Sequence, residues 1–494
     1  MKSLDILIKA LNKHELHNFQ PNILINNIEV DSRKVTKGDL FVCIKGQKVD
    51  GHDYALKAIN KGAIAIVSEE FINTTVPQIV VPCTKTAVSN LAACFYDYPS
   101  KKLKVIGVTG TNGKSSTTFI IRHILKTLGK KCGLIGTVEV DNGEKVVQAK
   151  LTTPQPLDLQ RYFYDMVNNN CEYAVMEVSS HALALQRVAN VDFAIAGFTN
   201  LSQDHLDYHS SMEEYRDVKS QLFERAKEAA IINADDYSGE YMASKAQVPV
   251  TYYSCNKSLT NGIFITDINL GGKGTEFVLH YKSTEYKVKT SLVGKFNIYN
   301  ILLSFGLISH FNINQADIVK AITSFPTIPG RFEAIESDGI TVIIDFAHSP
   351  DGLANVLKTS RSICKGNLTI VFGCGGDRDR TKRPIMGEIA AEYANDLVIT
   401  SDNPRTEDPK QIIEDICEGV RKHNTEFMVE VNREKAIEYA INKAQKGDII
   451  LIAGKGHETY QIVGDKVLPF DDKLVAEQKL REVKEKCEGG AQNK

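Results

Sequence analysis

The sequence has 494 residues, of which 43% are hydrophobic and 24% are charged, a composition typical of folded globular proteins. At roughly 150 residues per domain, this length predicts about three domains. The 59 Lys and Arg residues nearly balance the 61 Asp and Glu residues, so the net charge is −2. This charge excludes a bulk attraction to nucleic acid or to an anionic membrane, but it is compatible with a local basic pocket for phosphates.

The N-terminal segment predicts an amphipathic helix, because Leu4, Leu7, Ile8 and Leu11 recur at helical spacing. Charged residues interrupt the same segment, which excludes the apolar core of a signal peptide, and no later apolar run is long enough to span a bilayer. The ten Cys residues include no CxxC pair, so we expect buried free thiols rather than a disulfide framework or a zinc site. These features predict a cytoplasmic protein without membrane insertion.

Two soft boundaries divide the chain: a polar turn at residues 98–102 and a Pro/Gly break at residues 326–330. The predicted domains therefore cover residues 1–101, 102–329 and 330–494. In the second and third domains, short apolar runs are followed by polar loops and then by helical periodicity. These runs lie at residues 105–108, 173–178, 193–197, 342–346, 368–372, 397–400 and 449–453. The pattern predicts an α/β fold with mainly parallel sheets, which bind ligands beyond the carboxyl ends of their strands.

The strongest motif is residues 109–115 (TGTNGKS), between a predicted strand and a predicted helix that ends at Gly129. Glycines let backbone N–H groups surround phosphate oxygens, and a helix N-terminus adds positive potential. Lys114 can neutralise phosphates, and the Ser115 hydroxyl can bind Mg²⁺. A strict phosphate loop has Gly at position 108, which is Val here. We expect ATP binding, with an ordinary strand–helix turn as the competing interpretation.

Two clusters after this loop carry further candidate residues. Glu177 ends the next predicted strand, where a carboxylate can complete a magnesium shell, and helix capping or a surface position is its alternative. His205 and His209 are four residues apart, as in a helical zinc pair, but no third ligand is evident. We favour a role for His205 beside ATP. The sequence has neither a guanine-specific Asn-Lys-x-Asp motif nor an early G-x-G-x-x-G, which argues against a GTPase and against a dinucleotide dehydrogenase.

Seven segments, in order, resemble one family, the Mur ligases of peptidoglycan synthesis. They are residues 109–115, 177–181, 204–209, 297–300, 330–333, 345–351 and 402–405. The resemblance covers essentially the whole chain and implies an N-terminal UDP-binding domain, a central P-loop-type ATPase domain and a C-terminal Rossmann-like domain. It also implies an ATP-dependent ligase that acts on small molecules, as a monomer, in the cytoplasm. The rivals are a ligase like folylpolyglutamate synthetase and an ATP-sensing regulator that binds muropeptides without ligating them.

The chain is most similar to the family members that add the third peptide residue to UDP-N-acetylmuramoyl-L-Ala-D-Glu. The resemblance implies that ATP phosphorylates the D-glutamyl side-chain carboxylate and that an incoming amine attacks the acyl phosphate. It makes Lys114, Glu177, His205 and Lys219 the expected catalytic residues. It also implies two Mg²⁺ ions, held by Ser115, Glu177, His205 and a carbamate that CO₂ forms on Lys219. Without the family, Lys219 would be interpreted as a solvated helix residue.

The resemblance also assigns the substrate-binding residues. For ATP they are Gly110, Thr111, Asn112, Gly113, Lys114, Ser115, Ser116, Asn297, Asn300, Arg331, Asp345 and His348. For the UDP-muramoyl peptide they are Ser32, Thr152, Thr153, Ser179 and Arg187. For the incoming amino acid they are Arg378, Asp402, Asn403, Pro404, Arg405, Gly454 and Glu458. Plain turns and helix caps are the alternatives for several of these residues when each is considered alone.

Members of this group add either meso-diaminopimelate or L-lysine, which differ by one distal carboxylate. A guanidinium can bind that carboxylate bidentately, and leaving the guanidinium unpaired beside lysine costs ~1–3 kcal/mol. Residues 402–405 read Asp-Asn-Pro-Arg, the form that resembles diaminopimelate-adding members. We therefore expect Arg405 to bind this carboxylate, Arg378 the other one, and Gly454 with Glu458 the distal ammonium. An L-lysine-adding ligase is the alternative.

Overall fold

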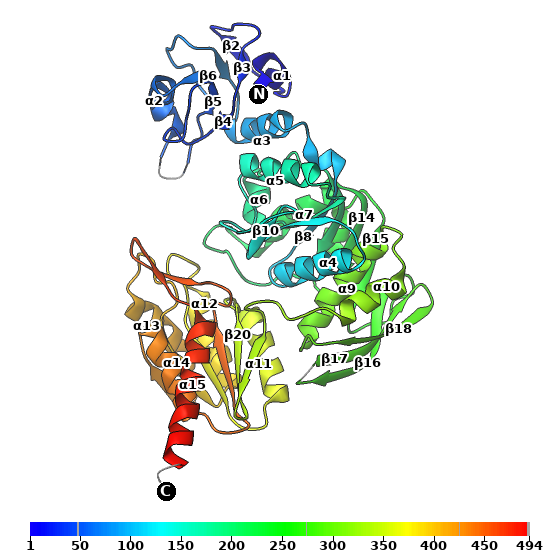
Figure 1. The fold of residues 1–494 in the computed structure, drawn as a ribbon, viewed down its shortest axis with the longest axis vertical. Coiled ribbons are helices and arrows are strands. Elements are labelled where there is room, and N and C mark those ends of the chain that lie inside the picture. Colours follow the sequence, from blue (N-terminus) through cyan, green and yellow to red (C-terminus); the bar gives the residue numbers. More distant parts are fainter. Residues whose placement is uncertain (47–48, 273, 424, 492–494) are drawn as a thin grey trace.

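The computed structural model describes residues 1–46, 49–272, 274–423 and 425–491, with side chains up to residue 485. Figure 1 shows three regions in chain order: a blue N-terminal region, a cyan-to-green central region and a yellow-to-red C-terminal region. Each region contains a sheet with helices packed against it. Within the described residues, no helix is both long enough and apolar enough to cross a membrane.

The N-terminal region is built on a five-stranded sheet of order β2-β7-β6-β5-β4, in which β4 to β7 run parallel and β2 is antiparallel. Its strands are β1 (Lys2–Ser3), β2 (Glu15–His17), β3 (Leu24–Ile25), β4 (Ile28–Glu29), β5 (Asp39–Val42), β6 (Ala63–Ser68) and β7 (Gln78–Val80). Its helices are α1 (Leu4–Ile8), η1 (Gly51–Tyr54), α2 (Ala55–Asn60) and α3 (Thr84–Phe95). Helix α1 is shorter than predicted, but all four of its predicted apolar residues are buried.

The central region contains an 11-stranded sheet of order β11-β10-β9-β12-β8-β13-β14-β15-β16-β17-β18. The strands from β9 to β16 in this order are parallel, and the two edges are antiparallel. The strands are β8 (Lys104–Thr109), β9 (Cys132–Ile135), β10 (Glu139–Asp141), β11 (Val146–Gln148), β12 (Tyr173–Glu177), β13 (Phe193–Phe198), β14 (Ala226–Asn233), β15 (Val250–Ser254), β16 (Ile263–Gly271), β17 (Gly274–Tyr281) and β18 (Thr284–Thr290).

Helices cover both faces of the central sheet. They are η2 (Pro99–Lys102), α4 (Lys114–Thr127), α5 (Pro156–Asn168), α6 (Ser180–Ala184), α7 (Met212–Arg225), α8 (Gly239–Lys245), α9 (Lys295–Ser309) and α10 (Gln315–Thr323). One apolar core joins α4, α9 and α10 to the sheet, and a second joins α5, α6 and α7 to its other face. Strand β8 contributes to both, because Val105 faces the second core whereas Ile106 and Val108 face the first.

The C-terminal region has a six-stranded sheet of order β19-β20-β24-β21-β22-β23, parallel except for β19. Its strands are β19 (Glu333–Ser337), β20 (Ile340–Asp345), β21 (Leu368–Phe372), β22 (Asp396–Ile399), β23 (Phe427–Val429) and β24 (Ile449–Ala453), and a hairpin pairs β25 (Tyr460–Val463) with β26 (Lys466–Pro469). Its helices are α11 (Pro350–Ile363), α12 (Lys382–Tyr393), α13 (Pro409–Val420), α14 (Arg433–Lys443) and α15 (Asp472–Ala491). Separate apolar cores lie on its two faces.

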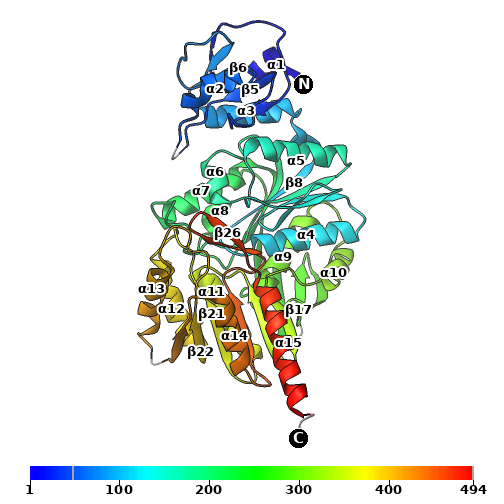
Figure 2. The same cartoon turned by 60° about the vertical axis from the view of Figure 1, so that its left-hand side comes forward.

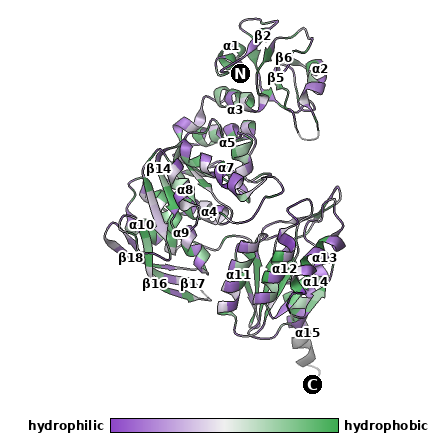
Figure 3. Cartoon of the chain, turned by 180° about the vertical axis from the view of Figure 1, so that it is seen from behind, coloured by the Kyte–Doolittle hydropathy of each residue, from purple (hydrophilic) through white to green (hydrophobic). Residues whose placement is uncertain are grey.

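Hydrophobic residues are concentrated on the strands and on the helix faces turned toward them, while the outer helix surfaces are hydrophilic (Figure 3). The predicted α/β fold with mainly parallel sheets is confirmed. The antiparallel strands β10, β11, β17 and β18 were not predicted, because their residues are partly exposed and form no continuous apolar run. The two boundaries between the three predicted domains stay predictions.

The central and C-terminal regions meet at the loops that follow their parallel strands (Figure 2). The Asn112 amide donates to the Asp351 carboxylate at 3.1 Å, and the Lys382 ammonium donates to the Asp204 carboxylate at 3.3 Å. Since ligands of parallel sheets bind beyond the carboxyl ends of strands, this boundary is where a site formed by both regions is expected.

Candidate active site

The phosphate loop between β8 and α4 needs glycine at two positions. Gly110 has φ +147°, and a Cβ atom there would lie 1.8 Å from the Thr199 hydroxyl oxygen. Gly113 has φ +85°, and a Cβ atom there would lie 2.4 Å from the Asn300 side-chain oxygen. Both positions therefore combine a left-handed backbone with a close neighbour, which only glycine tolerates. Helix α4 begins at Lys114, so the positive end of its dipole points at this loop.

Two lysines converge on the carbonyl of Gly110. The Nζ atom of Lys114 donates to Gly110 O at 2.9 Å and to Thr111 O at 2.7 Å, and the Nζ atom of Lys219 donates to Gly110 O at 2.8 Å. Lys219 on α7 is 1% exposed, so it is not the solvated helix residue that its spacing suggests. Burial lowers the pKa of Lys114, and burial together with the nearby Lys114 charge holds the pKa of Lys219 well below its ordinary value.

Glu177 ends β12, as predicted, and is fully buried, so it is not the surface residue that was the alternative. Its carboxylate accepts from the Thr137 N–H at 2.8 Å and from the Thr137 hydroxyl at 2.9 Å. The Thr137 hydroxyl also lies 3.1 Å from the Thr152 hydroxyl. A Cβ atom at Gly136 would lie 2.5 Å from a Glu177 oxygen, so the loop after β9 fixes this carboxylate closely. Thr137 was not predicted, since nothing near it in sequence resembles a motif.

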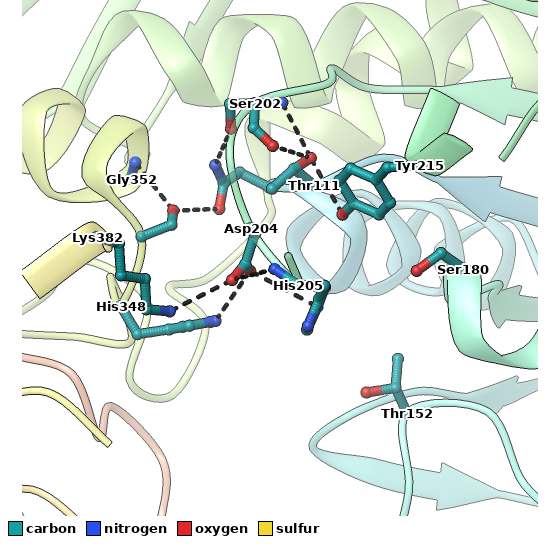
Figure 4. Close-up of polar contacts among 12 residues, drawn as sticks. Thr111, Thr152, Ser180, Ser202, Asp204, His205, Tyr215, His348, Gly352 and Lys382 are labelled. Carbon is teal, nitrogen blue, oxygen red and sulfur yellow. Dashed lines mark hydrogen bonds and ion pairs between the residues drawn. The ribbon is translucent and has the colours of Figure 1, made fainter. Parts of the chain in front are cut away.

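Asp204 lies at the centre of a polar cluster that joins the two regions (Figure 4). Its carboxylate is 3.3 Å from the Lys382 ammonium and 3.6 Å from Nε2 of both His205 and His348. Burial alone would raise the pKa of Asp204, but the His348 contact and the Lys382 charge hold this pKa well below its ordinary value. Burial lowers the pKa of His205 to about 3, against the opposing effect of Asp204. The His205 ring is therefore neutral and able to bind a metal ion at neutral pH.

The two histidines of this segment do not form the helical pair that their spacing could suggest. His205 has φ +56° and lies outside any helix, and Nε2 of His209 is 2.9 Å from the Ser180 hydroxyl oxygen. The His205 ring packs at 5.0 Å against the ring of His181, whose pKa burial lowers to about 4. His181 is thus part of the cluster, although the sequence assigned it no role.

Two predicted nucleotide-binding residues of the C-terminal region, Arg331 and Asp345, line a cavity together with the phosphate loop. A guanidinium nitrogen of Arg331 donates to the Ser115 hydroxyl at 3.1 Å. The Asp345 carboxylate accepts from the N–H groups of Phe332 and Ala347, each at 2.7 Å. Burial raises the pKa of Asp345 and lowers the pKa of Arg331, and each charge offsets the shift of the other.

These residues border a cavity of 370 Å³ that we call the nucleotide cavity. Of the predicted nucleotide-binding residues, its lining includes Asn112, Gly113, Ser116, Asn300, Arg331, Asp345 and His348. The aromatic rings of Phe296 and Tyr299 also line it, as a planar base requires. Asn297 does not line this cavity, but its side-chain oxygen accepts from the Asn300 amide at 3.3 Å.

A second cavity of 300 Å³, which we call the reaction cavity, brings the phosphate loop together with the predicted amino-acid site. Its lining from the central region is Thr111 to Ser116, Thr137, Thr152, Glu177, Asp204 and His205. Its lining from the C-terminal region includes Arg331, His348, Arg378, Lys382, Asp402, Asn403, Arg405, Gly454 and Glu458. Lys382, at the start of α12, is 5% exposed. It was not predicted, because none of the seven family-resembling segments includes it.

The predicted amino-acid residues follow three neighbouring strands, β21, β22 and β24. The Asn403 amide donates to the Glu458 carboxylate at 2.8 Å, and the buried Lys455 ammonium donates to the same carboxylate at 3.0 Å. Burial lowers the pKa of Arg405, and the nearby Arg378 charge lowers it further. Neither Arg405 nor Glu458 is the isolated surface or capping residue that was the alternative.

The predicted muramoyl-peptide residues fall into two groups. The Thr153 hydroxyl donates to Glu177 O at 2.8 Å and lies 3.3 Å from the Ser179 hydroxyl oxygen, and an Arg187 guanidinium nitrogen donates to Thr153 O at 3.1 Å. This group adjoins the reaction cavity through Thr152. Ser32 lies apart, in a 410 Å³ cavity of the N-terminal region that Arg33, Tyr54 and Lys57 also line.

The donor atoms around the phosphate loop fit Mg²⁺ bound together with a nucleotide. Among the residues that the structure describes, no group of three or more His, Cys, Asp or Glu side chains could hold a metal ion by itself. The reaction cavity offers single donors instead, namely the Ser115 hydroxyl, the Glu177 carboxylate and the His205 ring. Mg²⁺ takes few protein ligands and completes its octahedron with phosphate oxygens and water, so this donor set suits it.

Comparison with known proteins agrees with this architecture. Residues 24–106 match the model of the Mur ligase family, catalytic domain, residues 108–308 match the Mur ligase middle domain, and residues 330–456 match the Mur ligase, glutamate ligase domain. The UDP-N-acetylmuramoyl-L-alanyl-D-glutamate--2,6-diaminopimelate ligase of Geobacillus thermodenitrificans is 46% identical over 464 residues, which cover 92% of this chain and 94% of that protein.

A second relative of the same name, from Caldanaerobacter subterraneus subsp. tengcongensis, is 43% identical over 492 residues, which cover 98% of this chain and 99% of that protein. A solved structure, also of a UDP-N-acetylmuramoyl-L-alanyl-D-glutamate--2,6-diaminopimelate ligase, is 32% identical, has a TM-score of 0.66 and covers 94% of this chain and 95% of its own. The chain belongs to the Mur ligase family of ATP-dependent ligases.

Proposed function

We propose that this chain joins meso-diaminopimelate to the D-glutamyl side-chain carboxylate of UDP-N-acetylmuramoyl-L-Ala-D-Glu, with conversion of ATP to ADP and phosphate, in the cytoplasm. The observation that carries the proposal is the reaction cavity, which phosphate-loop residues line together with Arg378 and Arg405. Such a cavity can hold a phosphorylated carboxylate beside an amino acid that has two carboxylates of its own. The names of the relatives at 46% and 43% identity support the same reaction.

The reaction has two steps. A D-glutamyl carboxylate oxygen attacks the γ-phosphorus of ATP, and ADP leaves. The diaminopimelate amine then attacks the acyl carbon and loses a proton, and phosphate leaves. Because the first step brings a carboxylate against a triphosphate, the site needs positive charge at their meeting point. Lys114 and Arg331 supply it, since both line the reaction cavity. Lys114, Glu177, His205 and Lys219 are the catalytic residues of this proposal.

Two Mg²⁺ ions are part of the proposal, and they would screen the negative charge of the phosphates in both steps. Ser115, Glu177 and His205 would hold them, together with a carbamate on Lys219. An unmodified ammonium would be repelled by the ions, whereas a carbamate offers oxygen ligands. The lowered pKa of Lys219 supports the modification, because only the neutral amine attacks CO₂, releasing a proton.

The nucleotide cavity is the proposed site of ATP. Gly110 to Ser116 would surround its phosphates, Arg331 and Asp345 would contact its phosphates and ribose, and Asn297 and Asn300 its base. His348 lies in the same nucleotide-side loop as Asp345. The UDP-muramoyl peptide would extend from Ser32 in the N-terminal region to Thr152, Thr153, Ser179 and Arg187 beside the reaction cavity. The N-terminal, central and C-terminal domains would therefore bind UDP, ATP and the amino acid, respectively. The proposed domain boundaries lie at residues 101/102 and 329/330, and the proposed enzyme is a monomer.

The charges around the amino-acid site favour a substrate with two carboxylates. Arg378 and Arg405 carry two positive charges, while the Glu458 carboxylate is already paired with buried Lys455. Glu458, as a hydrogen-bond acceptor, and Gly454 would receive the distal ammonium. In this arrangement Asp402, Asn403 and Pro404 shape the site. Lysine would leave one guanidinium without a carboxylate, which disfavours it.

The test is identification of the product. Incubation with UDP-N-acetylmuramoyl-L-Ala-D-Glu, ATP, Mg²⁺ and meso-diaminopimelate is expected to yield a product heavier by one diaminopimelate residue in mass spectrometry. The Arg405→Ala variant is expected to form it with a strongly raised KM for meso-diaminopimelate and an unchanged KM for ATP. A wild-type enzyme that hydrolyses ATP without forming this product would contradict the proposal.

A further inference from the structure

The loops that carry Arg378 and Arg405 hold each other through reciprocal hydrogen bonds. The Asp377 N–H donates to the Glu407 carboxylate at 2.5 Å, and the Thr406 hydroxyl donates to the Asp377 carboxylate at 2.7 Å. The Thr406 N–H donates to the same Asp377 carboxylate at 3.3 Å. Each of the two loops therefore supplies both a donor and an acceptor to the other, directly beside the arginine that it carries.

The buried guanidinium of Arg383 contacts both of these loops. Arg383, on α12, has a fully buried side chain and donates to both Glu407 carboxylate oxygens, at 2.9 and 3.0 Å. It also donates to the Asp415 carboxylate at 2.8 Å and to Gly375 O at 3.3 Å. One side chain thus contacts the loop before Arg378, the loop after Arg405 and helix α13. We call Asp377, Arg383, Thr406 and Glu407 the loop lock.

Three features indicate that these loops need such a lock. Asp377 and Arg405 have φ of +53° and +52°, a strained region that surrounding contacts must impose. The two guanidinium groups also repel each other, since the Arg378 charge lowers the pKa of Arg405. In addition, a Cβ atom at Gly376 would lie 1.9 Å from Pro404 O, so the loops are in close backbone contact. Without contacts that hold the two loops in place, these like charges would move apart.

We infer that the loop lock sets the spacing of the two guanidinium groups and thereby determines the preference for an amino acid with two carboxylates over one with a single carboxylate. Its members act as positioning residues, because they hold the loops on which Arg378 and Arg405 lie and none of them lines the reaction cavity. This inference rests on the proposed function. Thr406 and Glu407 line neither the nucleotide cavity nor the reaction cavity, so loosening the lock at either residue is expected to leave acyl-phosphate formation intact and to change the capture of the amino acid.

The test compares Glu407→Gln with Glu414→Gln, a matched control on the neighbouring α13 whose carboxylate pairs with Arg421 and is half exposed. Both variants are assayed for kcat/KM with meso-diaminopimelate and with L-lysine. Acyl-phosphate formation is measured separately, by positional isotope exchange in ATP with UDP-N-acetylmuramoyl-L-Ala-D-Glu present and no amino acid added. Glu407→Gln is expected to lower the selectivity ratio on the order of 10- to 100-fold, mainly through the KM for meso-diaminopimelate. Isotope exchange is expected to stay at the wild-type rate. Glu414→Gln is expected to behave as wild type.

Thr406→Val serves as a second variant, because Thr406 is exposed and its hydroxyl donates only to Asp377, so folding is not at risk. It is expected to lower the ratio of kcat/KM for meso-diaminopimelate to kcat/KM for L-lysine several-fold. If Glu407→Gln unfolds, the Thr406→Val result alone tests the inference. Unchanged selectivity in Thr406→Val and in a folded Glu407→Gln, with a wild type that prefers meso-diaminopimelate, would overturn the inference and leave the proposed function standing. A wild type without that preference would overturn the proposed function and the inference with it.

Discussion

A buried ion pair beneath the amino-acid site offers a sharp test of how this region is held together. Arg433 and Asp472 are both 0% exposed in their side chains and form two hydrogen bonds, at 2.7 and 2.8 Å. Arg433 also donates to Ala453 O at 2.9 Å and to Ser401 O at 3.4 Å. It therefore ties α14 and α15 to the ends of β22 and β24, immediately before Asp402 and Gly454.

Asp472→Asn is expected to leave the Arg433 charge buried without its counter-charge. Removing one partner of such a pair costs about 3–5 kcal/mol of unfolding free energy. For a cooperative unit of 150–250 residues this corresponds to a Tm lower by about 6–20 °C. Because Ser401 and Ala453 precede substrate-binding residues, the KM for the amino acid is expected to rise as well.

Scanning calorimetry suits this measurement, since the chain has no Trp to report unfolding by fluorescence. The matched control is the double variant Arg433→Leu/Asp472→Leu, which removes both charges and is expected to regain much of the lost stability. The reasoning is refuted if the unfolding free energy of Asp472→Asn lies within about 1 kcal/mol of the wild-type value. It is also refuted if the second substitution lowers the unfolding free energy again by about as much as the first.

Three further perturbations test separate parts of the site. Lys219→Ala is expected to lower kcat by on the order of 100-fold or more, and ¹³CO₂ labelling of the wild type should give a carbamate resonance that the variant lacks; full activity of the variant would contradict this role. Lys382→Met and Asp204→Asn are expected to show a coupling of ~1–3 kcal/mol in kcat/KM in a double-mutant cycle, whereas additive losses would exclude a working contact between the two regions. Burial lowers the pKa of His457 to about 3, so between about pH 6.5 and 3 the unfolded chain binds a proton that the folded chain does not. The free energy of unfolding therefore decreases as the pH is lowered through this range. His457→Gln is expected to weaken that dependence in denaturant titrations at pH 7 and 5, and an unchanged slope would refute it.

The sequence predicted those parts of the site that are contiguous in the chain. Residues 109–115 combine glycines, Lys114 and Ser115 within one turn, and helical periodicity follows at once, so the strand, loop and helix were all identifiable. Strand-end positions such as Glu177 were also predictable, because parallel sheets gather them at one edge.

Contacts between distant segments could not be predicted in the same way. Asp204 and Lys382 are 178 positions apart, and Arg383 and Glu407 are joined only after two helices have packed. Thr137 carries no distinguishing residue pattern, and His181, although it ends the segment 177–181, has a place in the site only because the fold sets its ring beside that of His205. The helical interpretation of the His205–His209 spacing was also insufficient, since the backbone turns at His205 with positive φ.

The most direct test of the central claim is steady-state phosphate release with UDP-N-acetylmuramoyl-L-Ala-D-Glu, ATP and Mg²⁺, with meso-diaminopimelate and L-lysine compared as the added amino acid. The charge arrangement around Arg378 and Arg405 predicts turnover that depends on the amino acid, with a strong preference for meso-diaminopimelate. A preference for L-lysine would contradict the proposed roles of these two arginines. Phosphate release that is independent of any amino acid would contradict the ligase reaction itself.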